Sequence, residues 1–199
     1  NRTAEKIKKK ISAIDLYIWE VLMFFRSSKK KSQKKLDELC TQADIFIQVH
    51  FVRERNGEHY KFNTLSLKDD PEWTAVEKLL AENGNPESFS DTCQLFLRRT
   101  GKDETIIADR AGLENGYFTK LQNTDFYRPS KQETVLLCLA MRLNIEEARV
   151  LLKSAGYTLS NSEKSDLVIR YFLENQLYKT SDLDYVLNKL CETDLASIG

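Results

Sequence analysis

The chain has 199 residues, of which 41% are hydrophobic and 30% charged, with seven glycines and three prolines. This composition excludes collagen-like, low-complexity and wholly disordered chains, and the length suits one ordinary domain or two small ones. Thirty basic and thirty acidic side chains give a net charge of zero, so no global field attracts nucleic acid or an anionic membrane. The four cysteines lack metal-ligand spacing, and we expect a reduced, cytoplasmic protein without zinc.

Basic residues are concentrated at the beginning of the chain. Residues 1–35 contain 11 basic and three acidic side chains, a net charge of +8. Apolar residues from Thr3 to Arg26 recur every three or four positions, which predicts an amphipathic helix. Its most apolar stretch, Leu16 to Phe25, is far shorter than the roughly 20 residues that cross a bilayer, and no signal-peptide cleavage site follows it. We therefore expect no membrane span.

Residues 45–65 allow two interpretations. Apolar and polar residues alternate from Ile45 to Val52, Asn56-Gly57 is a typical hairpin turn, and the alternation resumes at Tyr60. This pattern predicts a β-hairpin. The alternative is a helix from Leu36 to Arg55, because the same apolar residues also suit a buried helical face.

A domain boundary is predicted after the next helix. That helix begins at Pro71, after the capping residue Asp70, and ends before the turn-forming cluster from Asn83 to Pro86. We predict two units: residues 1–85, which are helical or α+β, and residues 86–199, which are all-α. The fold class is therefore mainly α.

Seven short helices with short connections are predicted in the C-terminal unit. Capping boxes at Ser130-x-x-Glu133 and Asn144-x-x-Glu147 mark two of their beginnings, and Gly156 ends one helix. Ser162 and Ser181 are predicted to cap the last two.

The segment from Glu104 to Leu121 carries a more specific pattern. Ala108 is small where two helices would cross, Gly112 suits a turn with positive φ, and Phe118 and Leu121 are spaced to face a core. On these positions the segment resembles the helix-turn-helix of phage-repressor-like, or xenobiotic-response-element-type, regulators. The surrounding sequence resembles a recurrent helical domain of bacterial proteins over roughly residues 88–190, and this resemblance implies a repressor-like helical fold.

The resemblance also implies that the helix from Asn115 to Gln122 enters the major groove of DNA. Glu114 departs from the family, because it places a negative charge at the usual cap position, where it would approach phosphate. Residues 88–157 carry a net charge of only +1, which is weak for a DNA-binding domain. The predicted base-reading residues are Asn115, Thr119, Lys120 and Asn123, and the predicted phosphate contacts are Lys102, Arg128 and Lys131.

Two classes of function follow. The first is a bacterial, sequence-specific DNA-binding transcriptional regulator in which the N-terminal unit forms a homodimer or senses a signal. The second is an adaptor that uses a repressor-like helical scaffold to bind a protein, as the C-terminal part of a larger effector or alone. The sequence holds no phosphate-loop, nucleophile-elbow or dinucleotide-binding motif. We expect no catalytic site, no cofactor, no metal and no membrane partner.

Overall fold

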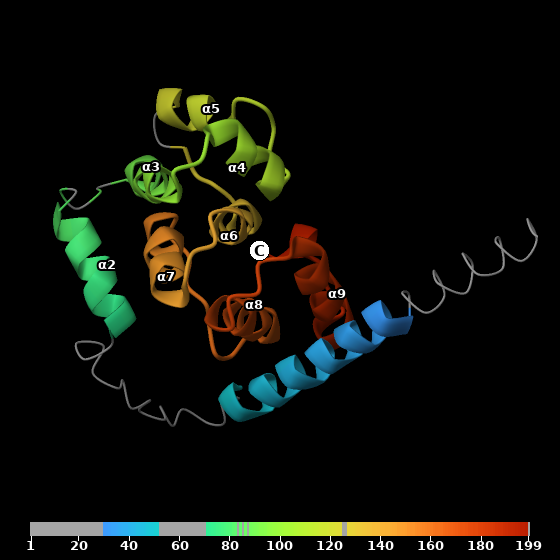
Figure 1. Cartoon of the computed structure of the whole chain (residues 1–199). Helices are drawn as coiled ribbons and strands as arrows, with labels where there is room; N and C mark the ends of the chain where they lie inside the picture. Colours follow the sequence, from blue (N-terminus) through green and yellow to red (C-terminus); the bar gives the residue numbers. More distant parts are fainter. Residues whose placement is uncertain are drawn as a thin grey trace, which may run out of the picture. The chain divides into compact units, whose positions relative to one another are not determined.

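The computed structural model describes residues 30–51, 71–82, 84, 86, 88–124 and 127–198. This part of the chain is mainly helical, as predicted, and contains no strand. Contacts divide the chain into two units, Asn1–Thr41 and Gln42–Gly199. The predicted amphipathic helix from Thr3 to Arg26 lies outside the described residues, and the first described helix covers residues 30–50 (Figure 1).

The predicted β-hairpin is wrong where the structure describes it. Residues 45–50 are helical, as the alternative interpretation predicts. Helical spacing explains the apolar pattern, because Ala43 and Ile47 are four residues apart and buried, whereas Ile45 and Val49 are exposed. The remainder of the predicted hairpin lies outside the described residues.

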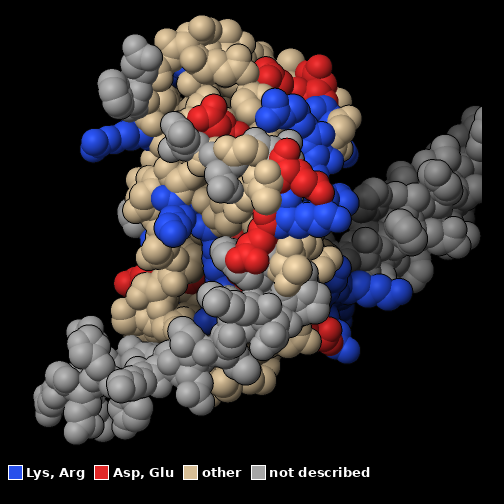
Figure 2. Space-filling model, turned by 90° about the vertical axis from the view of Figure 1, so that its left-hand side faces the viewer, with Lys and Arg blue, Asp and Glu red and all other residues tan. Residues whose placement is uncertain are grey.

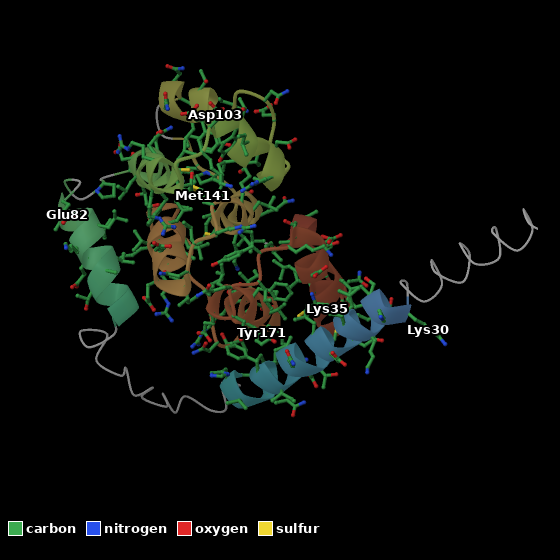
Figure 3. All side chains as sticks on the ribbon, in the orientation of Figure 1. Lys30, Lys35, Glu82, Asp103, Met141 and Tyr171 are labelled. Atoms are coloured by element: carbon green, nitrogen blue, oxygen red, sulfur yellow. The ribbon has the colours of Figure 1, made fainter. Side chains whose placement is uncertain are left out.

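Residues 42–50 pack against helix α8 (Lys164–Glu174). The hydroxyl of Tyr171, a residue labelled in Figure 3, donates a hydrogen bond to Gln42 Oε1 over 2.9 Å, and the Tyr171 ring centroid lies 5.5 Å from that of Phe46. The Arg170 guanidinium lies over the same Phe46 ring, 5.7 Å from its centroid. These contacts make residues 42–50 part of the second unit.

The remaining helices all belong to the second unit. They are α2 (Pro71–Glu82), α3 (Phe89–Thr100), α4 (Glu104–Ala111), α5 (Tyr117–Asn123), α6 (Lys131–Ala140), α7 (Ile145–Ser154), α8, α9 (Thr180–Cys191) and the 3₁₀ helix η2 (Leu195–Ser197). Seven of them, α3 to α9, are the seven α-helices predicted after residue 86. Contacts do not divide the chain near Asn83, since α2 packs against α7. Independent folding of residues 86–199 stays a prediction.

Capping residues begin several helices as the sequence predicts. Ser130 Oγ accepts a hydrogen bond from the Glu133 N–H at 3.1 Å, and the Glu133 carboxylate accepts one from the Ser130 N–H at 2.6 Å. Asn144 and Glu147 form the same reciprocal pair at the beginning of α7. Each pair satisfies two backbone donors that the first helical turn leaves without partners.

The predictions of Ser162 and Ser181 as caps are wrong. Helix α8 begins after Glu163, and the Ser162 hydroxyl is instead hydrogen-bonded to that of Ser160 at 2.8 Å. Helix α9 begins after Lys179, so Ser181 already lies within its first turn.

Helix α6 lies in the middle of the helices of the second unit and forms the centre of its core (Figure 1). Seven of its ten residues are buried, and α4 and α7 both pack against it. Helix α3 packs on α7, and α8 packs on α7 and α9. Two ion pairs add long-range links: Arg99 joins Glu147 at 2.6 Å, and Lys131 joins Asp166 at 2.8 Å. Charged as well as apolar contacts therefore hold this unit together.

Candidate nucleic-acid interface

The predicted DNA-binding segment consists of α4, α5 and the turn between them, here called the α4–α5 unit (residues 104–123). Asp103, labelled in Figure 3, caps its first helix: the carboxylate accepts hydrogen bonds from the Thr105 N–H at 2.8 Å and from the Thr105 hydroxyl at 2.6 Å. These hydrogen bonds lower the pKa of Asp103 below its ordinary value. The carboxylate is therefore charged at neutral pH, and its negative charge interacts favourably with the positive end of the helix dipole.

Gly112 ends α4 in the left-handed conformation, as the sequence predicts. Its φ is +66°, its N–H donates to the Asp109 carbonyl at 3.0 Å, and the Leu113 N–H donates to the Ala108 carbonyl at 2.9 Å. This pair of hydrogen bonds is a Schellman motif, which reverses the chain directly after the helix.

The predicted position of Glu114 as the cap of the second helix is wrong. Helix α5 begins at Tyr117, and the residue before it is Gly116, with φ +82° and no side-chain cap. The Tyr117 N–H donates to the Glu114 carbonyl at 3.1 Å, which closes the turn. The Glu114 side chain is thereby left to make a different contact.

One side of α5 is buried. Tyr117, Phe118 and Leu121 are each at most 2% exposed, and the predicted packing of Phe118 and Leu121 into the core is confirmed. The Tyr117 ring meets the Tyr127 ring edge to face at 6.0 Å, and the Tyr127 hydroxyl donates to Glu133 Oε1 at 2.9 Å. Burial raises the pKa of Tyr117, so this phenol stays neutral. Although α5 is short, its buried side anchors it firmly.

The opposite side of α5 is exposed and polar. Three predicted base-reading residues, Thr119, Lys120 and Asn123, lie there, while the fourth, Asn115, is exposed in the preceding turn. Asn123 Nδ2 already donates to the Thr119 carbonyl at 2.8 Å, but the amide oxygen of its side chain can still accept. The geometry therefore groups three of the four predicted residues on one helix face.

Gln122 belongs to this exposed face as well, and the sequence interpretation omitted it. Gln122 lies next to buried Phe118 on the helix surface, at the edge of the exposed face, so helical spacing alone does not assign it to that face. Its amide can both donate and accept hydrogen bonds.

Lys120 is the one charged residue in the sequence of α5, and it forms an ion pair with Glu114. Lys120 Nζ lies 2.7 Å from Glu114 Oε1, while the two side chains remain 54% and 61% exposed. The hydrogen bond that Lys120 donates to Glu114, followed by the negative charge of that carboxylate, raises the pKa of Lys120. The pair is thus an exposed donor and acceptor in direct contact.

The predicted phosphate contacts are only partly placed as expected. Lys102 and Arg128 are exposed, and neither forms an ion pair with another described residue. The prediction for Lys131 is wrong: its side chain is 10% exposed and is held by Asp166, which is 3% exposed. A lysine committed to a buried carboxylate is not available to a phosphate on the surface.

Charges of both signs are mixed on the surface. On the face drawn in Figure 2, Asp and Glu side chains lie directly beside Lys and Arg side chains. Among the described residues, no group of His, Cys, Asp and Glu is arranged to hold a metal ion, and no helix is long and apolar enough to cross a bilayer. The four cysteines are free, and Cys93 and Cys138 are buried.

The fold and this surface define a mainly helical protein with a short, anchored helix that exposes hydrogen-bonding side chains. Comparisons of the chain with known protein families, with curated proteins and with solved structures find no match.

Proposed function

We propose that the chain is a sequence-specific DNA-binding regulator of the helix-turn-helix class, with α5 placed in the major groove. The two-sided character of α5 carries this proposal: its apolar side is buried, and its exposed side presents Thr119, Lys120, Gln122 and Asn123. The major groove admits a helix, and base edges are read there by hydrogen bonds from such side chains. A rigidly held helix also loses little conformational freedom on binding.

Two further features support recognition of bases more than attraction to phosphates. Lys120 is already paired with Glu114 at 2.7 Å, and on the face drawn in Figure 2 acidic side chains lie beside the basic ones. Non-specific affinity for DNA comes almost entirely from phosphate neutralisation. We therefore expect weak non-specific binding and a shallow dependence of affinity on salt.

The proposal is tested by binding the full chain to a pool of random DNA duplexes at two salt concentrations and sequencing the bound fraction. We expect one sequence motif to be enriched. Replacement of Lys120 by Ala should weaken binding to that motif by about 1–3 kcal/mol, because a base or phosphate contact is lost. Lys153→Ala is the matched control, since Lys153 is an exposed lysine on α7, outside the α4–α5 unit.

Absence of any enriched sequence would contradict DNA recognition and favour the second candidate function, an adaptor that binds a protein. The mixed charges of the surface suit this alternative, because interfaces between proteins that bind reversibly are about as polar as the rest of the surface. Ile106, an apolar side chain on α4 that is 46% exposed, would add one apolar contact to such an interface. If α5 reads DNA, an Ile106→Ser variant should enrich the same motif as the wild type, because Ile106 is not among the residues on the exposed face of α5.

A further inference from the structure

Glu114 and Lys120 form an exposed ion pair at 2.7 Å across six residues of sequence. Glu114 lies in the turn before α5, and Lys120 lies on the exposed face that would enter the groove. Exposed ion pairs contribute little to stability, since ordering two long side chains offsets most of the attraction. The ion pair therefore adds little to the stability of the fold. It also places a carboxylate where DNA phosphates would repel it.

We propose that Glu114 and Lys120 act together as a reader of one G·C base pair in the major groove, an inference that rests on the proposed DNA-binding function. The carboxylate of Glu114 accepts a hydrogen bond from the cytosine N4 amino group. The ammonium group of Lys120 donates to guanine O6 and N7.

The chemistry of the pair matches the edge of this base pair. In the duplex the cytosine N4 amino group donates a hydrogen bond to guanine O6. Guanine O6 keeps one lone pair directed into the major groove, and cytosine N4 keeps one hydrogen directed there. Glu114 Oε1 and Lys120 Nζ, at 2.7 Å, present the complementary acceptor and donor side by side. Lys120 carries three donors and Glu114 a carboxylate, so both keep their mutual hydrogen bond while they contact the bases.

The neighbouring groups on each base distinguish G·C from A·T, which also offers an amino group beside a carbonyl. Guanine N7 gives Lys120 a second acceptor, whereas the corresponding place beside thymine O4 is a methyl group. Adenine N7 lies beside the adenine amino group, and its lone pair repels the carboxylate of Glu114. Both side chains of the pair therefore favour G·C.

The same pool experiment tests this inference with the full chain and the variant Glu114→Gln. A glutamine can accept from adenine N6 and donate to adenine N7, so we expect the preference at one G·C position of the motif to shift toward A·T by about tenfold. Other positions of the motif should keep their preferences. Both side chains are exposed, so the thermal midpoint of unfolding should not change.

Asp109→Asn is the matched control, because Asp109 is an exposed carboxylate on α4 and its replacement changes the net charge by the same amount. This control should raise affinity for all duplexes alike and leave the base preferences unchanged. Identical preferences for wild type and Glu114→Gln would overturn the base-reading role while DNA binding stands. Failure of the wild type to enrich any duplex would overturn both proposals.

Discussion

Gly112 shows how much one residue controls the geometry of the α4–α5 unit. Its φ is +66°, and a Cβ added there would meet no atom within 4 Å. The cost of a side chain at this position is therefore backbone strain, because there is no steric clash.

We expect Gly112→Val to lower the free energy of unfolding by about 1–3 kcal/mol, as a β-branched residue rarely adopts positive φ. Gly112→Asn should cost less, since asparagine tolerates the left-handed region. Urea unfolding of the full chain measures both values. An equal loss for the two variants would mean that φ is not the cause.

The buried pair of Lys131 and Asp166 sets a second requirement at the scale of single residues. Replacing Lys131 by Met should destabilise the chain by about 3–5 kcal/mol, because Asp166 would remain buried without its cation. The double replacement by Met and Leu should cost less than the sum of the two single replacements, although Asp166 also accepts from the Ser160 N–H at 2.9 Å. A cost of Lys131→Met below about 1 kcal/mol would show that Asp166 behaves like a surface carboxylate.

At the scale of elements, the beginning of α4 depends on a charged cap. The pKa of Asp103 lies below its ordinary value of 3.8 in the folded chain, so the unfolded chain binds the proton more readily. The stabilisation by this cap is complete above pH 3.8 and is lost as pH falls through the lower pKa of the folded chain.

The corresponding experiment compares thermal unfolding of wild type and Asp103→Asn from pH 7 downward. Asparagine caps a helix without titrating, so the wild type should lose more thermal stability than the variant below pH 3.8. Parallel curves for the two proteins would contradict a role for the Asp103 charge.

Elements governed by local rules were predictable from the sequence. The capping boxes at Ser130 and Asn144 and the turn at Gly112 depend on residues within a few positions, and all three are confirmed. The strand predicted at Ile45 failed because alternating β-branched residues also fit a helix when Ala43 and Ile47 find a buried surface. That surface comes from residues distant in sequence, which periodicity does not reveal.

The same limit applies to the candidate site. The exposed positions of Thr119, Lys120 and Asn123 follow from helical spacing once Phe118 and Leu121 are placed in the core. The burial of Lys131 depends on Asp166, a partner on another helix, and no local pattern identifies it. DNA binding itself and an independent C-terminal domain stay predictions.

At the scale of the whole molecule, contacts assign residues 42–50 to the same unit as α8, although a long stretch of chain separates them. Limited proteolysis of the full chain, followed by native size-exclusion chromatography and mass spectrometry, checks this assignment. We expect peptides that contain Gln42 and Phe46 to elute together with those that contain Tyr171, because buried Ala43 and Ile47 hold the helix in place. Separate elution would show that the two segments belong to different folded bodies.

The reactivity of two buried thiols can report transient opening of the second unit. Cys93 and Cys138 are fully inaccessible, and burial raises the pKa of Cys93 to about 12, so neither thiol reacts while the native packing persists. Cys40 and Cys191 are partly exposed and react earlier. The rate at which an alkylating reagent modifies Cys93 and Cys138 therefore measures the transient openings of the unit in the unaltered chain, and a bound duplex that stabilises the fold should slow it.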